Sequence, residues 1–263
     1  MKRNRIRVLQ GILLLLVVVS TGVLIYDMII VPKQNQEMTK HLKEEFPEKD
    51  TSSSGAAPSP EKPDEQGEKQ PAGEEQPPVS SIDFPALQKT YPDIKGWITI
   101  PDTEIDYPVL QSGETEPEYY LKRNYRGETD VNGSLFLQWN CDVLESQNLI
   151  VYGHNMNSGA MFGNLDRYTD PAYLRMYPDI FFQTSEGLDV YQIVAVLKAD
   201  ASMFPFQQVN FSAPESLEEY IKQAKSLSLF EIGSSADAAI RTLTLVTCSY
   251  EWEESRTIVI AAK

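Results

Sequence analysis

The sequence predicts a mainly β domain in residues 82–263, closed as a barrel or packed as a sandwich. At least seven short runs in this region are rich in β-branched and aliphatic residues, and polar turns separate them. The first 80 or so residues contain no plausible globular core. Many short strands with frequent turns are typical of barrels and sandwiches. We therefore expect one domain, long enough to bury a full core.

The elements of this domain can be taken in order. A short amphipathic helix is expected over residues 83–91, because Asp83 can cap it and Pro85 suits its first turn. The expected strands are Trp97–Ile100, Ile105–Val109, Ser134–Trp139, Asn148–Gly153, Val190–Leu197, Leu243–Cys248 and Thr257–Ala261. Residues Glu215–Phe230 have one apolar face, which predicts a helix inserted before the Leu243 strand.

The N-terminus predicts a membrane anchor. Residues 1–10 are basic, and residues 11–31 are almost entirely apolar and would span roughly 30 Å as one helix. Basic residues before the span predict a cytoplasmic N-terminus and an extracellular folded domain, so a single-pass protein of the cell membrane. A cleaved signal peptide is the alternative, because residues 20–22 are small. The apolar run continues to Ile30, which favours an uncleaved anchor.

Residues 32–81 are predicted to be an extracytoplasmic tether rich in Pro, Glu and Ser. Residues 34–46 have a composition compatible with a helix, whereas residues 51–80 contain six prolines and few large apolar side chains. Such a segment cannot bury enough apolar surface to offset the entropy of its chain. It would let a folded head reach substrates away from the membrane, although an inert spacer has the same composition.

Charge argues against a nucleic-acid partner. The chain has a net charge of −15, and residues 82–263 carry 13 Lys or Arg against 26 Asp or Glu, a net of −13. An acidic surface repels phosphate backbones.

Cysteine and histidine are too scarce for a zinc site. The sequence has two Cys, Cys141 and Cys248, and two His, His41 and His154. These ligands alone cannot build a tetrahedral site, since His41 lies beside the apolar segment. Nothing indicates a metal or an organic cofactor. A disulfide is the alternative use of the two thiols, but an exported chain that relies on disulfides usually has more cysteines.

Three reactive side chains are expected at strand ends. Cys248 ends one predicted strand and Arg256 precedes the next, and the short polar loop between them suits a hairpin. In an antiparallel pair such residues lie about 5 Å apart. His154 follows the strand Asn148–Gly153 in the same way.

These residues lie in motifs that resemble those of sortases, the membrane-anchored cysteine transpeptidases of Gram-positive bacteria. The segment TLVTC, which ends at Cys248, resembles the TLxTC motif of the family, and YGHN around His154 resembles the segment of its catalytic histidine. Arg256 falls where the family has its arginine. The resemblance covers residues 83–263 and implies a closed sortase-type barrel of about eight strands.

Within the family, the chain resembles class B. The short interval from Cys to Arg, the N-terminal helix and the helix-bearing insert before the Cys strand carry this likeness. Class C members usually have an Asp-Pro-aromatic lid ahead of the barrel, and this sequence has none there. Some class B members have an acidic residue two positions after the Cys. Tyr250 stands there, which argues against an acidic third catalytic partner at that position.

The chemistry of the groups suggests a mechanism. A thiolate is the effective nucleophile, and a nearby imidazolium stabilises it, so Cys248 and His154 form a coupled pair. Arg256 is suited to hold the oxyanion that develops during attack on a peptide carbonyl. His154 then protonates the departing amine, and an incoming amine resolves the thioester.

The resemblance implies the substrates. The donor would be a C-terminal sorting motif of a secreted protein, of NPxTN or xPxTG type, cleaved after Thr; the acceptor would be an amine of a peptidoglycan precursor of lipid II type. Thr247 and Asn124 are further candidates for substrate contacts, although the first can be an ordinary strand residue and the second a turn residue. The alternatives are a hydrolytic cysteine peptidase and a non-catalytic module of the cell envelope.

Overall fold

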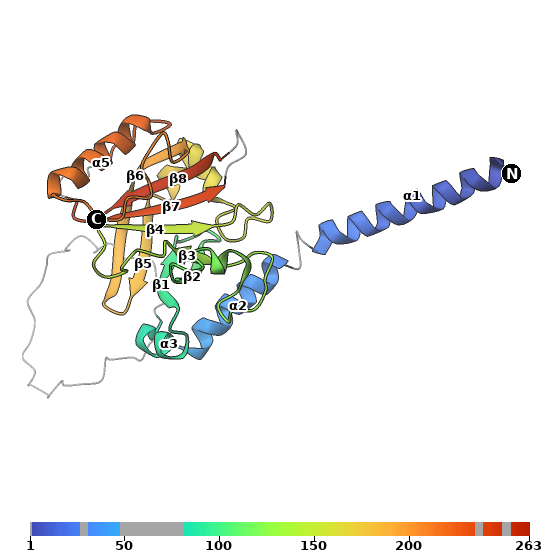
Figure 1. Ribbon diagram of the computed structural model, residues 1–263, viewed down its shortest axis with the longest axis horizontal. Coiled ribbons are helices and arrows are strands. Elements are labelled where there is room, and N and C mark those ends of the chain that lie inside the picture. Colours follow the sequence, from blue (N-terminus) through green and yellow to red (C-terminus); the bar gives the residue numbers. More distant parts are fainter. Residues whose placement is uncertain (1, 27–30, 48–81, 235–238, 249–253) are drawn as a thin grey trace, which may run out of the picture.

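A computed structural model describes residues 2–26, 31–47, 82–234, 239–248 and 254–263. Eight strands form a closed barrel in the order β1-β2-β3-β4-β7-β8-β6-β5 (Figure 1). The strands are β1 Ile94–Thr99, β2 Asp106–Leu110, β3 Leu135–Leu137, β4 Asn148–Gly153, β5 Asp179–Thr184, β6 Gly187–Ala199, β7 Thr242–Cys248 and β8 Arg256–Ala262. The predicted mainly β class and the eight-stranded closed barrel are confirmed.

One strand was missing from the prediction. β5, with the sequence DIFFQT, pairs antiparallel with both β1 and β6 and thereby closes the barrel. Its Ile180 and Phe182 are fully buried. The apolar stretch is only three residues long, so periodicity does not distinguish it from a turn of helix. Pairing with β1, some 80 residues earlier in the chain, makes it a strand.

Helices precede and connect the barrel strands. α3 (Phe84–Thr90) is the predicted first helix, and the Asp83 carboxylate caps it by accepting a hydrogen bond of 3.1 Å from the backbone N–H of Ala86. α5 (Pro214–Leu227) is the predicted insert before the Cys strand. The remaining short elements are α4 (Pro171–Met176) and the 3-10 helices η2 (Tyr119–Lys122) and η3 (Leu165–Thr169). Figure 1 shows α5 along β6, on the side of the barrel away from α2 and α3.

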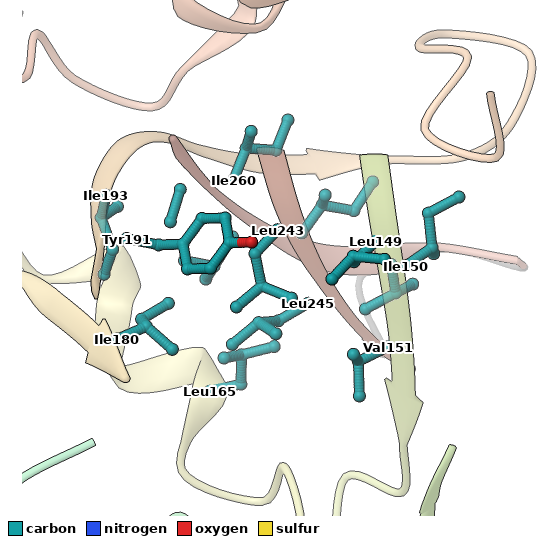
Figure 2. Packing of buried hydrophobic residues seen from close by; sticks show 14 of the residues in the cluster. Leu149, Ile150, Val151, Leu165, Ile180, Tyr191, Ile193, Leu243, Leu245 and Ile260 are labelled. Atoms are coloured by element: carbon teal, nitrogen blue, oxygen red, sulfur yellow. The ribbon is translucent and has the colours of Figure 1, made fainter. Parts of the chain in front are cut away.

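The interior of the barrel is a single apolar core. Figure 2 shows side chains from β4, β7 and β8 meeting those of β5, β6 and η3, with Leu245 near the centre. Most of these residues have less than 2% of their surface exposed. Burial of that extent contributes roughly 1.5–3 kcal/mol for each large aliphatic side chain, which is enough to hold the strand ends in a fixed arrangement. Met161, Phe162 and Leu165, expected to be core residues, are part of this cluster.

The N-terminal helix α1 runs from Lys2 to Ile25 and extends away from the barrel in Figure 1. Its apolar side chains from Ile12 to Val19 each have more than half of their surface exposed. Among the residues that the structure describes, no helix reaches the length and hydropathy needed to cross a membrane. The predicted span was one helix over residues 11–31; in the structure α1 ends at Ile25, and residues 27–30 lie outside the described part.

A second N-terminal helix packs directly on the barrel domain. α2 (Val31–Glu45) buries Leu42 to 1% exposure against a cluster that includes Trp97 and Tyr125. The Lys43 ammonium pairs with the Asp106 carboxylate at the start of β2. The backbone N–H of Asp83 donates to the carbonyl of Phe46, so the chain before and after residues 48–81 is joined at this point. The range 32–81 thus includes a helix that is part of the folded domain, and residues 48–81 lie outside the described part.

Candidate active site

Three neighbouring strands bring the predicted catalytic positions to one end of the barrel. β4 and β7 are parallel, with Gly153 opposite Thr247, so the next residues along the chain, His154 and Cys248, lie side by side. β7 and β8 are antiparallel, and their last pair is Cys248 opposite Arg256. The hairpin expected from the spacing of Cys248 and Arg256 is present. The parallel pairing of β4 with β7 brings His154 to the same end of the barrel as these two residues.

The His154 ring is held by a backbone carbonyl. Its Nε2 lies 2.7 Å from the carbonyl oxygen of Leu121, in η2. A carbonyl only accepts hydrogen bonds, so Nε2 carries a proton in both charge states of the ring. Nδ1 is therefore the nitrogen that exchanges a proton with a reacting group.

Arg256 begins β8 and is partly buried. Its Nη1 donates a hydrogen bond of 3.0 Å to the carbonyl oxygen of Ser255. This contact uses one of the five N–H donors of the guanidinium, so the group retains donors for a substrate oxygen. Arg256 also lines the cavity described below, as does His154.

Thr247 lies next to the predicted nucleophile and is 2% exposed. Its hydroxyl donates a hydrogen bond of 2.7 Å to the carbonyl oxygen of Gly153. The bond connects β7 to β4 one residue before Cys248 and one before His154. Thr247 also lines the cavity, so the predicted substrate contact and this structural role involve the same side chain.

Asn124 is located away from that lining, in the loop after η2. Its side-chain oxygen accepts hydrogen bonds from the backbone N–H groups of Arg126 and Glu128, and its amide nitrogen donates to the Glu128 carboxylate. An Asn that bonds to the backbone two residues later is a common turn former. The structure thus gives Asn124 the turn role.

A cavity of about 620 Å³ opens at this end of the barrel. Besides His154, Thr247 and Arg256, its lining includes Trp139 and Phe206. Pockets of this size, with apolar walls and a few polar groups, accommodate a peptide segment or a small ligand. The cavity therefore offers space for a ligand beside His154, Thr247 and Arg256.

The aromatic wall of this cavity was not predicted from the sequence. Tyr152 stacks on Phe136 with ring centroids 5.5 Å apart, and its hydroxyl donates a 2.7 Å hydrogen bond to the Gln138 side chain. Burial raises the pKa of Tyr152 to about 12, so the phenol stays protonated. All three side chains line the cavity. Tyr152 lies within YGHN, two residues before His154. Side chains two positions apart in a strand lie on the same face, and this spacing could have identified Tyr152.

The other cysteine is separate from this site. Cys141 is a free thiol with 5% of its surface exposed, so it forms no disulfide. Burial raises its pKa to about 11, which makes it a weak nucleophile at neutral pH. Tyr250 and the Cys248 side chain lie outside the described part of the chain. Among the described residues, no cluster of three or more His, Cys, Asp or Glu side chains could hold a metal ion.

Comparison with known proteins points to one family. Residues 98–263 match the family described as "Sortase domain". The chain is 34% identical over 177 residues to the sortase B of Listeria monocytogenes, covering 66% of this chain and 70% of the relative. Two solved structures are similar: Clostridium perfringens sortase B, with a TM-score of 0.61, 27% identity and coverage of 68% of this chain and 97% of that one, and a Staphylococcus aureus sortase B–substrate complex, with a TM-score of 0.61, 25% identity and coverage of 68% and 83%.

Proposed function

The chain belongs to the sortase family of cysteine transpeptidases, and from this premise we propose that it cleaves a C-terminal sorting motif of secreted proteins and joins them to a peptidoglycan amine. Its similarity to sortase B proteins supports the class B assignment. The motif would be of NPxTN or xPxTG type, and the acceptor a precursor of lipid II type.

The observation that carries the proposal is the convergence of three strand ends on one cavity. β4 ends just before His154, β7 ends at Cys248 and β8 begins at Arg256. Two of these side chains line a cavity whose size suits a peptide segment. A nucleophile, a proton carrier and a fixed cation beside a peptide site are the requirements of acyl transfer.

The first half of the reaction forms a thioester. The Cys248 thiolate attacks the carbonyl carbon after the motif Thr, and negative charge develops on the carbonyl oxygen. Arg256 stabilises that charge through its fixed N–H donors. The C–N bond then breaks, and Nδ1 of the His154 imidazolium gives its proton to the departing amine.

The second half transfers the acyl group to an amine. Neutral His154 takes a proton from the incoming amine as the amine attacks the thioester, and Cys248 leaves as a thiolate. Glu118 and Glu254 also line the cavity, and their carboxylates favour the approach of an amine in its charged form, which loses one proton to solvent before it attacks. Their position supports an amine rather than water as the acceptor.

We place the enzyme outside the cytoplasm, held at the membrane by residues 11–31. The support comes from the basic tail before this segment and from the exposed apolar side chains of α1. Cell fractionation combined with external protease digestion tests the proposal: the catalytic domain should sediment with membranes and be cleaved in intact protoplasts. Recovery of an intact chain in the soluble fraction would refute it.

The function itself is tested with quenched fluorescent peptides varied around an N/S-P-x-T-N/G core, mixed with the full chain and an amine acceptor. We expect cleavage after Thr and a product in which the acceptor is joined to the Thr carboxyl, identified by mass spectrometry. Cys248→Ala should abolish both.

Two results would contradict transpeptidation. A free Thr carboxylate as the main product at saturating amine would identify a hydrolytic cysteine peptidase. Unchanged cleavage by Cys248→Ala would remove the proposed nucleophile altogether.

A further inference from the structure

A carboxylate outside the cavity connects the segment of the catalytic histidine to the strand of the arginine. Asp166, in η3, accepts a hydrogen bond of 2.9 Å at Oδ2 from the side-chain amide of Asn155. Its other oxygen, Oδ1, accepts hydrogen bonds from the Thr257 hydroxyl and, at 2.9 Å, from the Lys198 ammonium. Asn155 directly follows His154, and Thr257 directly follows Arg256.

The two sides of this connection are not adjacent in the sheet. Between β4, which precedes His154, and β8, which begins at Arg256, lies β7. After β4 the chain folds back, with a hydrogen bond of 3.0 Å from the Phe162 N–H to the His154 carbonyl and a bridge between Asn155 and Met161. This fold brings η3 close both to the residues that follow β4 and to the start of β8.

Burial indicates that the connection is rigid. The Thr257 side chain is fully buried in β8, where it pairs with Lys198 of β6. The Lys198 side chain is 13% exposed and the Asp166 side chain 37%, so their ion pair is partly shielded from water. Hydrogen bonds of this kind, between charged groups with restricted solvent, are shorter and stronger than neutral ones.

We propose that Asp166 is a positioning residue that sets the placement of His154 and Arg256 relative to each other through Asn155 and Thr257. The proposal rests on the function proposed above. Asp166 does not itself line the cavity, so it acts on the rate of the chemical step rather than on substrate binding. A displacement of about 1 Å between reacting groups can reduce the rate about 100-fold.

Asp170 offers a matched control in the same segment. It lies four residues later and caps α4 by accepting a hydrogen bond of 2.8 Å from the backbone N–H of Ala172. Removing a cap lowers the stability of the helix that it begins. Asp170→Ala therefore perturbs the fold locally, without breaking a contact to the residues beside His154 or Arg256.

The test measures alkylation of Cys248 by iodoacetamide as a function of pH, in the full chain, alongside thermal unfolding and peptide turnover. Displacing the His154 imidazolium or the Arg256 guanidinium raises the pKa of the neighbouring Cys248 thiol. We expect Asp166→Ala to move the pH profile of alkylation upward, to slow alkylation at neutral pH about tenfold and to lower kcat more than it changes KM. Asp170→Ala should lower Tm but keep the wild-type profile.

Thr257→Val provides a second variant in case Asp166→Ala does not fold, because it keeps a β-branched side chain in β8 and removes only the hydroxyl. It should shift the profile in the same direction. A wild-type profile in Asp166→Ala or in Thr257→Val, or an equal shift in Asp170→Ala, would overturn the positioning role. If wild-type Cys248 reacts no faster than a free cysteine at neutral pH, the proposed Cys–His pair fails instead, which separates the two hypotheses.

Discussion

The Leu121 carbonyl oxygen lies 2.7 Å from Nε2 of His154, and this bond determines which ring nitrogen faces the reaction. The carbonyl is itself kept in place by close packing. The α-carbon of Gly133 approaches it so closely that a Cβ added there would lie 2.2 Å from the same oxygen. Gly133 also has φ +58°, a conformation that disfavours other residues. The orientation of His154 thus depends on a glycine twenty-one positions before it.

Gly133→Ala should therefore reduce activity by displacing the Leu121 carbonyl. We expect kcat to fall at least about tenfold, since a small misplacement of a catalytic group is costly, and Tm to fall as well. Gly113→Ala is the control, because an added Cβ there meets nothing within 4 Å. Peptide turnover and thermal unfolding of both variants check this. Wild-type kcat in Gly133→Ala would show that the carbonyl does not orient the ring.

Arg256→Lys should lose most activity although it keeps the positive charge. Lysine lacks the planar fork of donors that a developing oxyanion requires, and removing one such donor typically costs about 100-fold in kcat. The exposed Arg175 is a suitable site for the control substitution Arg175→Lys. Steady-state kinetics of both variants on the sorting peptide measure the loss. Near-normal kcat/KM in Arg256→Lys would place the arginine away from the oxyanion.

Asn124→Ala separates a turn former from a substrate contact. The Asn124 side chain makes three hydrogen bonds within its own loop, and removing such bonds typically costs about 1–3 kcal/mol. We expect a lower Tm and a KM for the sorting peptide close to that of the wild type. The opposite pattern, an unchanged Tm with a raised KM, would support the substrate contact that the sequence suggested.

Leu42→Ala tests whether α2 belongs to the folded domain. Leu42 is 1% exposed in the contact between α2 and the barrel, and truncation of a buried leucine typically costs about 2–5 kcal/mol. Lys40→Ala, on the exposed side of the same helix, should cost less than about 0.5 kcal/mol. Denaturant unfolding of both variants measures the difference. Equal stabilities would mean that α2 is only part of the tether.

Asp166 should also contribute to stability in a pH-dependent way. Burial alone would raise its pKa, but hydrogen bonds from Thr257, Lys198 and Asn155, together with the Lys198 charge, hold the pKa below its usual value of 3.8. A pKa that is lower in the folded than in the unfolded state stabilises the fold above the unfolded-state pKa. That stabilisation is lost as the pH falls through the folded-state pKa.

The measurement is Tm from about pH 6 to pH 2 for the wild type and Asp166→Asn. We expect the two Tm values to differ most at the upper end and to converge under acid, because the protonated wild type resembles the variant. A constant difference over the whole range would contradict this assignment.

Much of the barrel was predictable from the sequence. Its strands show either alternating apolar and polar residues or a continuous apolar run, over lengths that are typical of strands and too short for helices. The strand before His154 was predicted at its actual bounds, and those around Cys248 and Arg256 to within one residue. β5 was missed because Ile180–Phe182 is too short to show a period. Helix α2 was described only as helix-compatible, although Met38, Leu42 and Phe46 recur every four residues, a spacing that could have indicated a packed face.

By itself, the sequence determined seven of the eight strand segments, the hairpin that joins Cys248 to Arg256 and the motifs that relate the chain to its family. These depend on local spacing and side-chain type, which can be read along the chain. Only the tertiary structure decided that β4 lies parallel to β7, that Leu121 holds His154 and that Asp166 joins Asn155 to Thr257. Those contacts join residues 11 to 94 positions apart, and their geometry is set by the closure and packing of the barrel rather than by local sequence.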